Sequence, residues 1–478
     1  MEKTKATQQV ASFLVAVLLC FDTGLCDSEM SSVVAPMEGG EKEALYSAIE
    51  GFVGDWWNGS GLYPDPCGWT PIQGVLCDFF EGLWYITGIN IGPVLENSLE
   101  CSQDANFTPS LFNLKHLKTL SLFDCFTSQN TTIPSVNWNK LSSSLETLEL
   151  RSNPSLIGKI PVGFGQLSKL QSLVLIENSL SGEMPNELGY LGNLKRLSLE
   201  GNKFSGNIPS SLGHNLSDLL ILDLSRNYLT GSLPSSLGSL TSLLKLDLSN
   251  NLLHGSLPNE LGNLKKLTLF DMRSNNLSGG LSQSLQEMVS LQDLLLSDNP
   301  NIGGNLVEFK FSSLINLTNL DLSNMGLRGI IPESISKLNK LRFLALDNNY
   351  LSGSVPSKLE ALPSLRALHV NANNLTGELE FSEEFYTRMG RRFASWNNPS
   401  LCYKVGKVSR ENAPFGLNEC RNEKDYNVNS KNKIEEENPD ENSRFIASVG
   451  PSDNSVSGFW GVVLVQDLVV VFLLVLLL

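Results

Sequence analysis

The sequence predicts an α/β solenoid, a one-dimensional stack of coils that each contribute a short strand and a short helical segment. The first observation is a repeated frame, L-x-x-L-x-L-x-x-N-x-L-x-G-x-L-P, which stands around Asn251 in this 478-residue chain. The second is its spacing: the steps between frames at 202, 227, 251, 275 and 299 are 25, 24, 24 and 24 residues. A fixed period of this length is typical of solenoids. The other frames are centred on Asn153, Asn178, Asn202, Asn227, Asn275, Asn299, Asn349 and Asn373.

The L-x-L part of the frame predicts a strand. Because successive strand side chains point to opposite faces, we expect Leu246 and Leu248 in the core, and Asp247 and Ser249 in solvent. One coil cannot bury its own apolar edge, so stacked coils share a core and the end coils need caps. Asn251 stands where the chain leaves the strand, and its amide is expected to satisfy backbone groups of adjacent turns.

With these residues the chain resembles the leucine-rich repeat family, and the L-x-G-x-[IL]-P half of the frame resembles its plant-specific subclass. The resemblance implies a superhelix with a parallel concave β-sheet, second short strands and short convex helices. Local irregularity is expected where Met325 replaces the Asn, 26 residues after Asn299, and where Leu281-Ser282 and Leu379-Glu380 lack the proline. The glycine column is Gly182, Gly206, Gly231, Gly255, Gly279, Gly329, Gly353 and Gly377, and the proline column is Pro161, Pro185, Pro209, Pro234, Pro258, Pro332 and Pro356.

The ends of the chain predict secretion and capping. Lys3 and Lys5 precede an apolar run, which favours a cleaved signal peptide at 1–26, since a signal anchor needs a longer apolar span. Residues 27–83 resemble the N-terminal cap of plant repeat proteins, and we expect Trp56 and Trp57 to pack in its core rather than to form a carbohydrate platform. The repeats then occupy 84–396, with about ten regular coils after irregular first coils, and a C-terminal cap occupies 397–420.

The tail predicts membrane attachment. Residues 421–446 are charged and aperiodic, typical of a flexible stalk. In 447–478, small residues precede a terminal apolar run, which favours a glycosylphosphatidylinositol (GPI) anchor signal. The alternative is a transmembrane helix, which would bury Asp467 near its middle at a free-energy cost of roughly 2.5 to 3.5 kcal/mol.

Cysteines and glycosylation sequons agree with an oxidising, extracellular setting. Removal of the signal peptide leaves six cysteines, and nearest-neighbour pairing is the simplest of their 15 possible connectivities. Cys125 also occupies the Asn position of a repeat frame, so it is either a reduced internal thiol or the partner of Cys101. The expected pairs are Cys67–Cys77, Cys101–Cys125 and Cys402–Cys420. The N-glycosylation sequons begin at Asn58, Asn106, Asn130, Asn215, Asn276, Asn316 and Asn374.

Composition argues against several functions. The formal charge of −15 and pI near 4.9 disfavour nucleic acid as the main partner. Equivalent strand positions are occupied by Asp223, Asp247, Asp271 and Asp321. The sequence LDLS is common in this repeat, however, so we expect these aspartates to be solvated strand residues. Without companion His or Cys geometry we predict no metal site, no cofactor and no catalytic residue.

The repeats therefore offer a binding surface. The outward strand positions form a concave wall with charges of both signs beside apolar residues, which suits an extended peptide or protein better than a small metabolite. The candidate ligand-binding residues are Arg196, Glu200, Asp223, Lys245, Asp247, Asp271, Arg273, Phe343 and His369.

The arrangement of signal, tryptophan-rich cap, plant-type coils, NNPSLC cap and tail without a kinase resembles the plant receptor-like proteins. The resemblance implies a cell-surface protein of the plasma membrane that signals through a partner receptor kinase, in plant–microbe interaction (with an endophytic fungus) or development. The main alternative is a cell-wall inhibitor of microbial polygalacturonase. Such inhibitors usually end soon after the C-terminal cap, so residues 421–478 count against it. Structural wall adhesion is a third hypothesis.

Overall fold

The structure is a computed structural model that describes residues 37–93, 98–404, 408–409 and 411–420. The chain divides into two units, Met1–Cys420 and Arg421–Leu478, and every described residue belongs to the first. The predicted signal peptide, stalk and membrane-attachment tail therefore lie outside the described residues. No helix in the described part is both long and apolar enough to cross a membrane.

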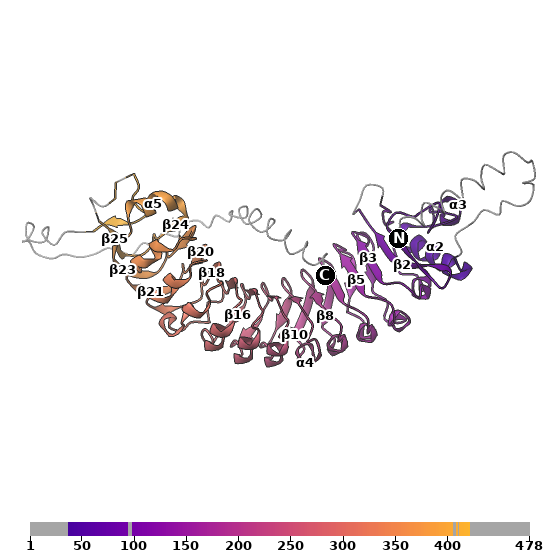
Figure 1. Ribbon diagram of the computed structural model, residues 1–478, viewed down its shortest axis with the longest axis horizontal. Helices are drawn as coiled ribbons and strands as arrows, with labels where there is room; N and C mark the ends of the chain where they lie inside the picture. The colour runs from indigo at the N-terminus through magenta and orange to yellow at the C-terminus, as the bar shows by residue number, and fades with distance from the viewer. Residues whose placement is uncertain (1–36, 94–97, 405–407, 410, 421–478) are drawn as a thin grey trace, which may run out of the picture. The chain divides into compact units, whose positions relative to one another are not determined.

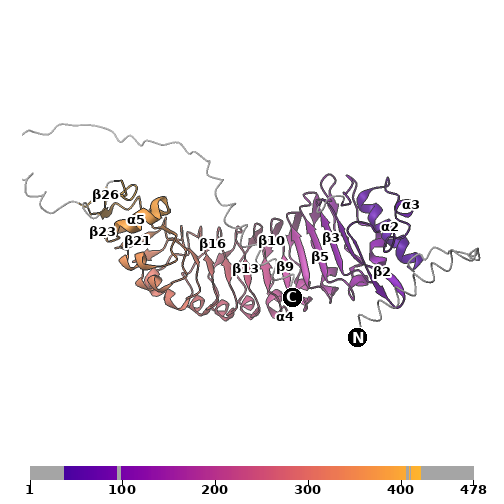
Figure 2. The same cartoon turned by 45° about the horizontal axis from the view of Figure 1, so that its top comes forward.

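The coils of residues 37–420 stack into the predicted solenoid, whose strands line up side by side along its inner face (Figures 1 and 2). Fourteen of the described strands form one sheet, which is parallel except for the antiparallel pair β1–β2 at its N-terminal edge. Its strands are β1 (Val75–Phe80), β2 (Leu83–Ile91), β3 (Thr119–Phe123), β5 (Thr147–Arg151), β7 (Ser172–Ile176), β9 (Arg196–Ser198), β11 (Ile221–Asp223), β13 (Lys245–Asp247), β15 (Leu269–Asp271), β17 (Asp293–Leu295), β18 (Asn319–Asp321), β20 (Phe343–Ala345), β22 (Ala367–His369) and β24 (Phe393–Ala394).

Short second strands follow the Asn position of most coils, as the plant-type frame predicts. They form three smaller parallel sheets and are interrupted between residues 277 and 328, where the 26-residue spacing predicts irregularity. The first sheet contains β4 (Thr131–Thr132), β6 (Leu156–Gly158), β8 (Ser179–Glu183), β10 (Lys203–Asn207) and β12 (Tyr228–Thr230). The second contains β14 (His254–Gly255) and β16 (Asn276–Leu277), and the third β19 (Arg328–Gly329), β21 (Tyr350–Gly353), β23 (Asn374–Leu379), β25 (Ser400–Tyr403) and β26 (Asn418–Glu419).

Short helices return the chain along the convex side, mostly as single 3-10 turns (Figure 1). Proline commonly stands just before them, where its fixed φ suits the entry and no backbone N–H is needed. They are η1 (Pro109–Asn113), η2 (Trp138–Leu141), η3 (Val162–Gln166), η4 (Asn186–Tyr190), α4 (Ser211–Asn215), η5 (Ser235–Ser239), η6 (Asn259–Asn263), η7 (Gln283–Glu287), η8 (Leu306–Glu308), η9 (Phe311–Ser313), η10 (Glu333–Lys337) and η11 (Ser357–Ala361).

Leucines and asparagines of the frame hold neighbouring coils together. Leu246 and Leu248 are fully buried, as the alternation predicts. The amide nitrogen of Asn251 donates to the carbonyl oxygens of Leu224, Leu248 and Ser249 at 3.0, 3.1 and 3.2 Å. Its amide oxygen accepts from the backbone N–H of Leu229 at 3.0 Å. Each such side chain therefore satisfies backbone groups of two coils inside an apolar stack.

The N-terminal cap is built on α2 (Gly39–Val53), which buries an apolar face against β2 and η1, and on α3 (Gly59–Leu62). Trp57 is buried between the rings of Tyr46 and Tyr63, as expected. The same expectation is wrong for Trp56, which is 73% exposed. Consecutive side chains after the helix end at Gly54 point in different directions, so only one tryptophan faces the core.

The elements α5 (Glu383–Met389) and η12 (Gly390–Arg392) directly precede the predicted C-terminal cap. The aromatic rings of Phe381, Phe385 and Phe393 pack together there, with centroids 4.3 to 5.7 Å apart. The asparagines of successive frames, Asn153 to Asn373, form a column along the stack, which we call the asparagine column. Asn398 continues it, because its amide donates to the carbonyl oxygen of Val370 at 3.0 Å. Residues 397–420, predicted as a cap, thus retain one element of the repeat.

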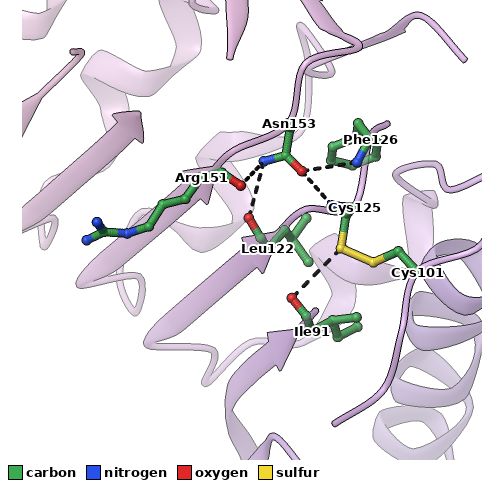
Figure 3. The surroundings of a disulfide bond; sticks show 7 residues. All are labelled: Ile91, Cys101, Leu122, Cys125, Phe126, Arg151 and Asn153. Carbon is green, nitrogen blue, oxygen red and sulfur yellow. Dashed lines mark hydrogen bonds between the residues drawn. A yellow bond between two sulfur atoms is a disulfide. The ribbon is translucent and has the colours of Figure 1, made fainter. Parts of the chain in front are cut away.

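Three disulfides have the nearest-neighbour pairing, Cys67–Cys77, Cys101–Cys125 and Cys402–Cys420. Cys125 also keeps the Asn position of its frame, so both of its patterns hold at once (Figure 3). Its sulfur is buried 3.8 Å from the carbonyl oxygen of Ile91, and its backbone N–H donates to the side-chain oxygen of Asn153 at 2.7 Å. The disulfide therefore attaches the segment at Cys101 directly to the core of the stack.

Candidate functional site

The concave face of the 14-stranded sheet presents three rows of outward side chains, set by the strand register. We call them the first, middle and third rows, after the positions of Lys245, Asp247 and Ser249 in β13. The register aligns Arg196, Ile221, Lys245, Leu269, Asp293, Asn319, Phe343 and Ala367 in the first row. It aligns Ser198, Asp223, Asp247, Asp271, Leu295, Asp321, Ala345 and His369 in the middle row. Two residues further along each coil, the third row includes Glu200, Ser225, Ser249, Arg273 and Ser297.

Asp223, Asp271 and Asp321 of the middle row are buried and Asp247 is partly buried, so the expectation that these aspartates are solvated is wrong. Ser249, which was also expected in solvent, is 4% exposed. Asp223 is 5% exposed and Asp271 3%. The carboxylate of Asp223 accepts from both the backbone N–H and the hydroxyl of Ser225, at 3.2 and 2.7 Å. Asp271 instead accepts from the guanidinium of Arg273, at distances down to 2.6 Å. The side chains of the third row therefore cover those of the middle row. The sequence LDLS forms a hydrogen-bonded unit that is largely buried.

Two aspartates on adjacent strands share one lysine. The Lys245 ammonium lies 2.9 Å from Asp223 and 3.6 Å from Asp247. Burial, followed by the charges of Asp223 and Asp271, raises the pKa of Asp247 to about 6. Burial alone would lower the pKa of Lys245, but the two carboxylates beside it raise it. The centre of the face thus holds a carboxyl group that titrates at mildly acidic pH.

A second charged network was not predicted. The Arg226 guanidinium bridges Glu177 and Glu200, at 3.0 Å from each. Hydrogen bonding from Arg226 lowers the pKa of Glu177, whereas burial, reinforced by Asp223, raises the pKa of Glu200. Arg226 lies beyond the L-x-L segment, directly before a column asparagine, at a φ of 55°. The position before each column asparagine repeatedly has positive φ, and this regular position could have drawn attention to Arg226.

Arg196 differs from the other cations of this face. Its guanidinium is half-buried, and its Nε donates to the hydroxyl of Ser198 at 3.2 Å. Burial, with Arg151 nearby, lowers its pKa. Over the described ranges Arg196 forms no ion pair within 4.0 Å, while Lys245, Arg273 and Arg226 all do. The guanidinium of Arg196 can therefore donate hydrogen bonds to a ligand carboxylate without breaking an ion pair within the protein.

The structure separates the predicted site residues into two clusters. Those from Arg196 to Arg273 lie together on β9, β11, β13 and β15 or directly after them. Phe343 and His369 form a second cluster on the adjacent strands β20 and β22, with edge-to-face rings 5.4 Å apart. Strands β17 and β18 lie between the two clusters. A ligand that touches both must be extended.

The sequons lie mainly on the surface. Six of their asparagines are exposed, whereas Asn316 is half-buried and donates to the carbonyl oxygen of Val289 at 2.9 Å. Within the residues that the structure describes, no group of three or more His, Cys, Asp or Glu side chains could hold a metal ion. The exposed asparagines are Asn58, Asn106, Asn130, Asn215, Asn276 and Asn374.

The fold, the asparagine column and the paired sheets are those of a plant-type leucine-rich repeat solenoid. The family description "Leucine rich repeat" matches residues 311–375, and a second description of that repeat matches 193–215, 218–240 and 242–264.

Two curated relatives come from Arabidopsis thaliana. Piriformospora indica-insensitive protein 2 is 58% identical over 144 residues, 30% of this chain and 34% of that protein. Receptor like protein 29 is 36% identical over 181 residues, 37% of this chain and 38% of that protein. The matched stretches thus span only about a third of these relatives' length.

Solved structures of plant receptor ectodomains are similar to this fold. The ectodomain of the Arabidopsis thaliana receptor kinase GASSHO1/SCHENGEN3, in complex with CASPARIAN STRIP INTEGRITY FACTOR 2, has a TM-score of 0.56 and 33% identity, covering 66% of this chain and 38% of that one. The Arabidopsis receptor kinase HAESA, in complex with the peptide hormone IDA and the co-receptor SERK1, has a TM-score of 0.57 and 28% identity, covering 77% of this chain and 62% of that one.

Proposed function

We propose that this chain is a non-kinase, non-enzymatic cell-surface receptor-like protein that binds an extended peptide or protein ligand on its concave face. The observation that carries the proposal is Arg196, a half-buried cation on the first row whose guanidinium donates to the hydroxyl of Ser198 rather than to a carboxylate. Such a group is desolvated in advance and binds a ligand carboxylate with a charge-assisted hydrogen bond. The similar ectodomains solved with peptide ligands support the same class of ligand.

The second cluster supplies the apolar end of the site. Phe343 and His369 are half-buried and offer ring surface on adjacent strands. Aromatic side chains of this kind commonly anchor interfaces. A peptide ligand that places an acidic group on Arg196 and an apolar side chain near Phe343 would follow the sheet across five intervening strands, β11, β13, β15, β17 and β18.

Signalling in this proposal passes through a partner receptor kinase. The HAESA complex contains a co-receptor beside its peptide, which supports that kind of assembly. The relative named for insensitivity to Piriformospora indica suggests response to an endophytic fungus as the physiological setting.

Immunoprecipitation from plant membranes, followed by mass spectrometry, tests the proposal. We would compare the full chain with Arg196→Gln and with Lys266→Gln, an exposed lysine outside the three rows. We expect a kinase and a ligand to be recovered with the wild type and the Lys266 variant, with about tenfold weaker ligand binding for Arg196→Gln. Equal affinity of all three proteins would contradict the concave site, and inhibition of a fungal polygalacturonase would favour the inhibitor hypothesis instead.

We further propose that the chain is secreted, N-glycosylated and held on the outer face of the plasma membrane by a GPI anchor within 447–478. Phosphatidylinositol-specific phospholipase C should then release it from intact cells. Retention under conditions that release a known anchored protein would indicate a spanning helix.

A further inference from the structure

The flank formed by the second strands contains a hollow where the strands are interrupted. It has a volume of about 410 Å³, within the roughly 300–1,000 Å³ range of small-molecule sites. Two pairs of consecutive glycines form its wall, Gly279-Gly280 and Gly303-Gly304, with φ between 60° and 96°. Because these are left-handed conformations that L-residues rarely adopt, the backbone itself keeps side chains out of this space.

At most other coils of the flank the same space is filled, although a Cβ on Gly377 would also meet nothing within 4 Å. The side chain that follows the column glycine of one coil lies under the column glycine of the next. A Cβ on Gly329 would stand 2.0 Å from the Asn305 side chain, and a Cβ on Gly353 would stand 2.8 Å from that of Ile330. A Cβ on Gly304 would meet only the Cα of Gly280, at 3.5 Å. The hollow exists because Gly280 stands where other coils have a side chain.

The lining combines apolar and polar groups. Leu281 contributes partly exposed apolar surface, and the side chains of Phe309 and Leu327, each 1% exposed, lie behind it. Asn305 accepts from the backbone N–H of Val307 through its side-chain oxygen, at 3.2 Å, which leaves its amide nitrogen as a donor. Gln283 and Glu308, both exposed, add further polar atoms at the rim. A sugar ring has this same combination of an apolar face and polar edges.

A sugar is expected next to the hollow. Asn276 begins the sequon Asn276-Leu277-Ser278 and lies three residues before Gly279 on the same coil, a separation of roughly 10 Å in extended chain. Its side chain is exposed, and its oxygen accepts from the Asn301 amide at 2.7 Å. That bond orients the side chain and leaves the nitrogen, which would carry the glycan, directed elsewhere.

We propose that the glycine hollow is the docking site for the two proximal N-acetylglucosamine residues of an N-glycan on Asn276. The glycan replaces the side chain that Gly280 lacks and covers the interruption between β16 and β19. Covalent attachment gives it a high effective concentration there, so weak contacts suffice.

Asn374 provides a matched comparison inside the same chain. It also begins a second strand and is exposed, and its sequence Asn374-Leu375-Thr376-Gly377-Glu378 differs from that of Asn276 chiefly in having Glu378 where Gly280 stands. A glycan on Asn374 therefore has an occupied flank beside it.

Endoglycosidase release from the native, secreted full chain carrying high-mannose glycans tests the docking. The enzyme cleaves between the first two sugars, so we expect release at Asn276 to be about tenfold or more slower than at Asn374, and equal after denaturation. Gln283→Trp, which fills the hollow from its exposed rim, should abolish the difference, whereas Gln283→Ala should preserve it. Asn276→Gln should lower Tm by about 2 °C more than Asn374→Gln does.

Equal release rates at the two sites in the native wild-type protein would overturn the docking. Peptide mapping that finds Asn276 unmodified in secreted protein would overturn it as well. A difference that persists in Gln283→Trp would show that the protection arises outside the hollow.

Discussion

At the scale of single residues, the asparagine column shows how a polar side chain stabilises an apolar stack. Asn251 is 6% exposed and makes four hydrogen bonds. The carbonyl oxygens of Leu224 and Leu248 also accept from the neighbouring column asparagines Asn227 and Asn275. Removal of the Asn251 side chain would leave the buried backbone N–H of Leu229 without its acceptor, which costs more than the bond itself contributes. At Met325, where the column asparagine is missing, the backbone N–H donates instead to the side chain of Asn349, at 3.0 Å.

We therefore expect Asn251→Ala to lower the free energy of unfolding by about 3 kcal/mol. Urea unfolding followed by circular dichroism measures it. Asn263→Ala, at an exposed asparagine, is the control and should change stability by less than about 0.5 kcal/mol. Equal effects of the two substitutions would show that the column is not a special position.

The carboxyl of Asp247 makes stability depend on pH. Its folded pKa of about 6 lies above its ordinary value of 3.8, and its side chain is only 16% exposed. The folded state therefore binds the proton more tightly, so the contribution of this group to stability is fully present below pH 3.8 and is lost as pH rises through 6. The difference of about 2 pKa units corresponds to about 3 kcal/mol.

Asp247→Asn should remove this dependence, because Asn can still accept from Ser249. Relative to wild type, the variant should gain about 3 kcal/mol between pH 4 and pH 7.5, measured by denaturant unfolding across that range. If the stability curves of the wild type and the variant stay parallel across this pH range, a group other than Asp247 titrates. The charged groups that face Asp247 are Asp223, Asp271 and Lys245.

At the scale of elements, the Cys101–Cys125 disulfide connects a segment before η1 to the strand side of the stack (Figure 3). It closes a separation of 24 residues, for which the chain-entropy model gives about 3 kcal/mol. The double variant Cys101→Ser/Cys125→Ala should lose about that amount while keeping the column bond from residue 125 to Asn153, which uses the backbone N–H. Non-reducing peptide mapping of the secreted wild type provides the check, since an alkylatable Cys125 would contradict the pairing.

Element-scale features were predicted where their cause is local. The L-x-L alternation determines which side chains face the core within one strand, so the strands and the core leucines were predictable. The second strands were expected only from the resemblance of the L-x-G-x-[IL]-P half to the plant-specific subclass. The burial of Asp223 was not, because it depends on Lys245 from the next strand and on Ser225 in the third row. Arg226 was likewise missed, because its two partners come from two earlier coils.

At the scale of the whole repeat unit, each coil contacts mainly its neighbours, so stability is approximately a sum over adjacent pairs. The main sheet is continuous from β15 through β17 to β18, but the second-strand flank is interrupted between β16 and β19. The coil at 299–327 therefore has fewer sheet contacts to its neighbours than the coils before it, and the caps cover only the two ends. Opening of the solenoid should begin inside the stack, at this interruption.

Hydrogen exchange measured by mass spectrometry tests where the stack opens. Amides of residues 304–305 should exchange about tenfold or more faster than those of Leu252 and His254, which donate to the preceding coil. The N–H of Gly303, which donates to the carbonyl oxygen of Met325 at 2.8 Å, should stay protected. Amides of β17 should stay protected, because this strand pairs on both sides in the main sheet. Faster exchange throughout β17 would mean that the whole coil opens as one unit, and uniform protection along the flank would show that the missing second strand does not weaken the stack.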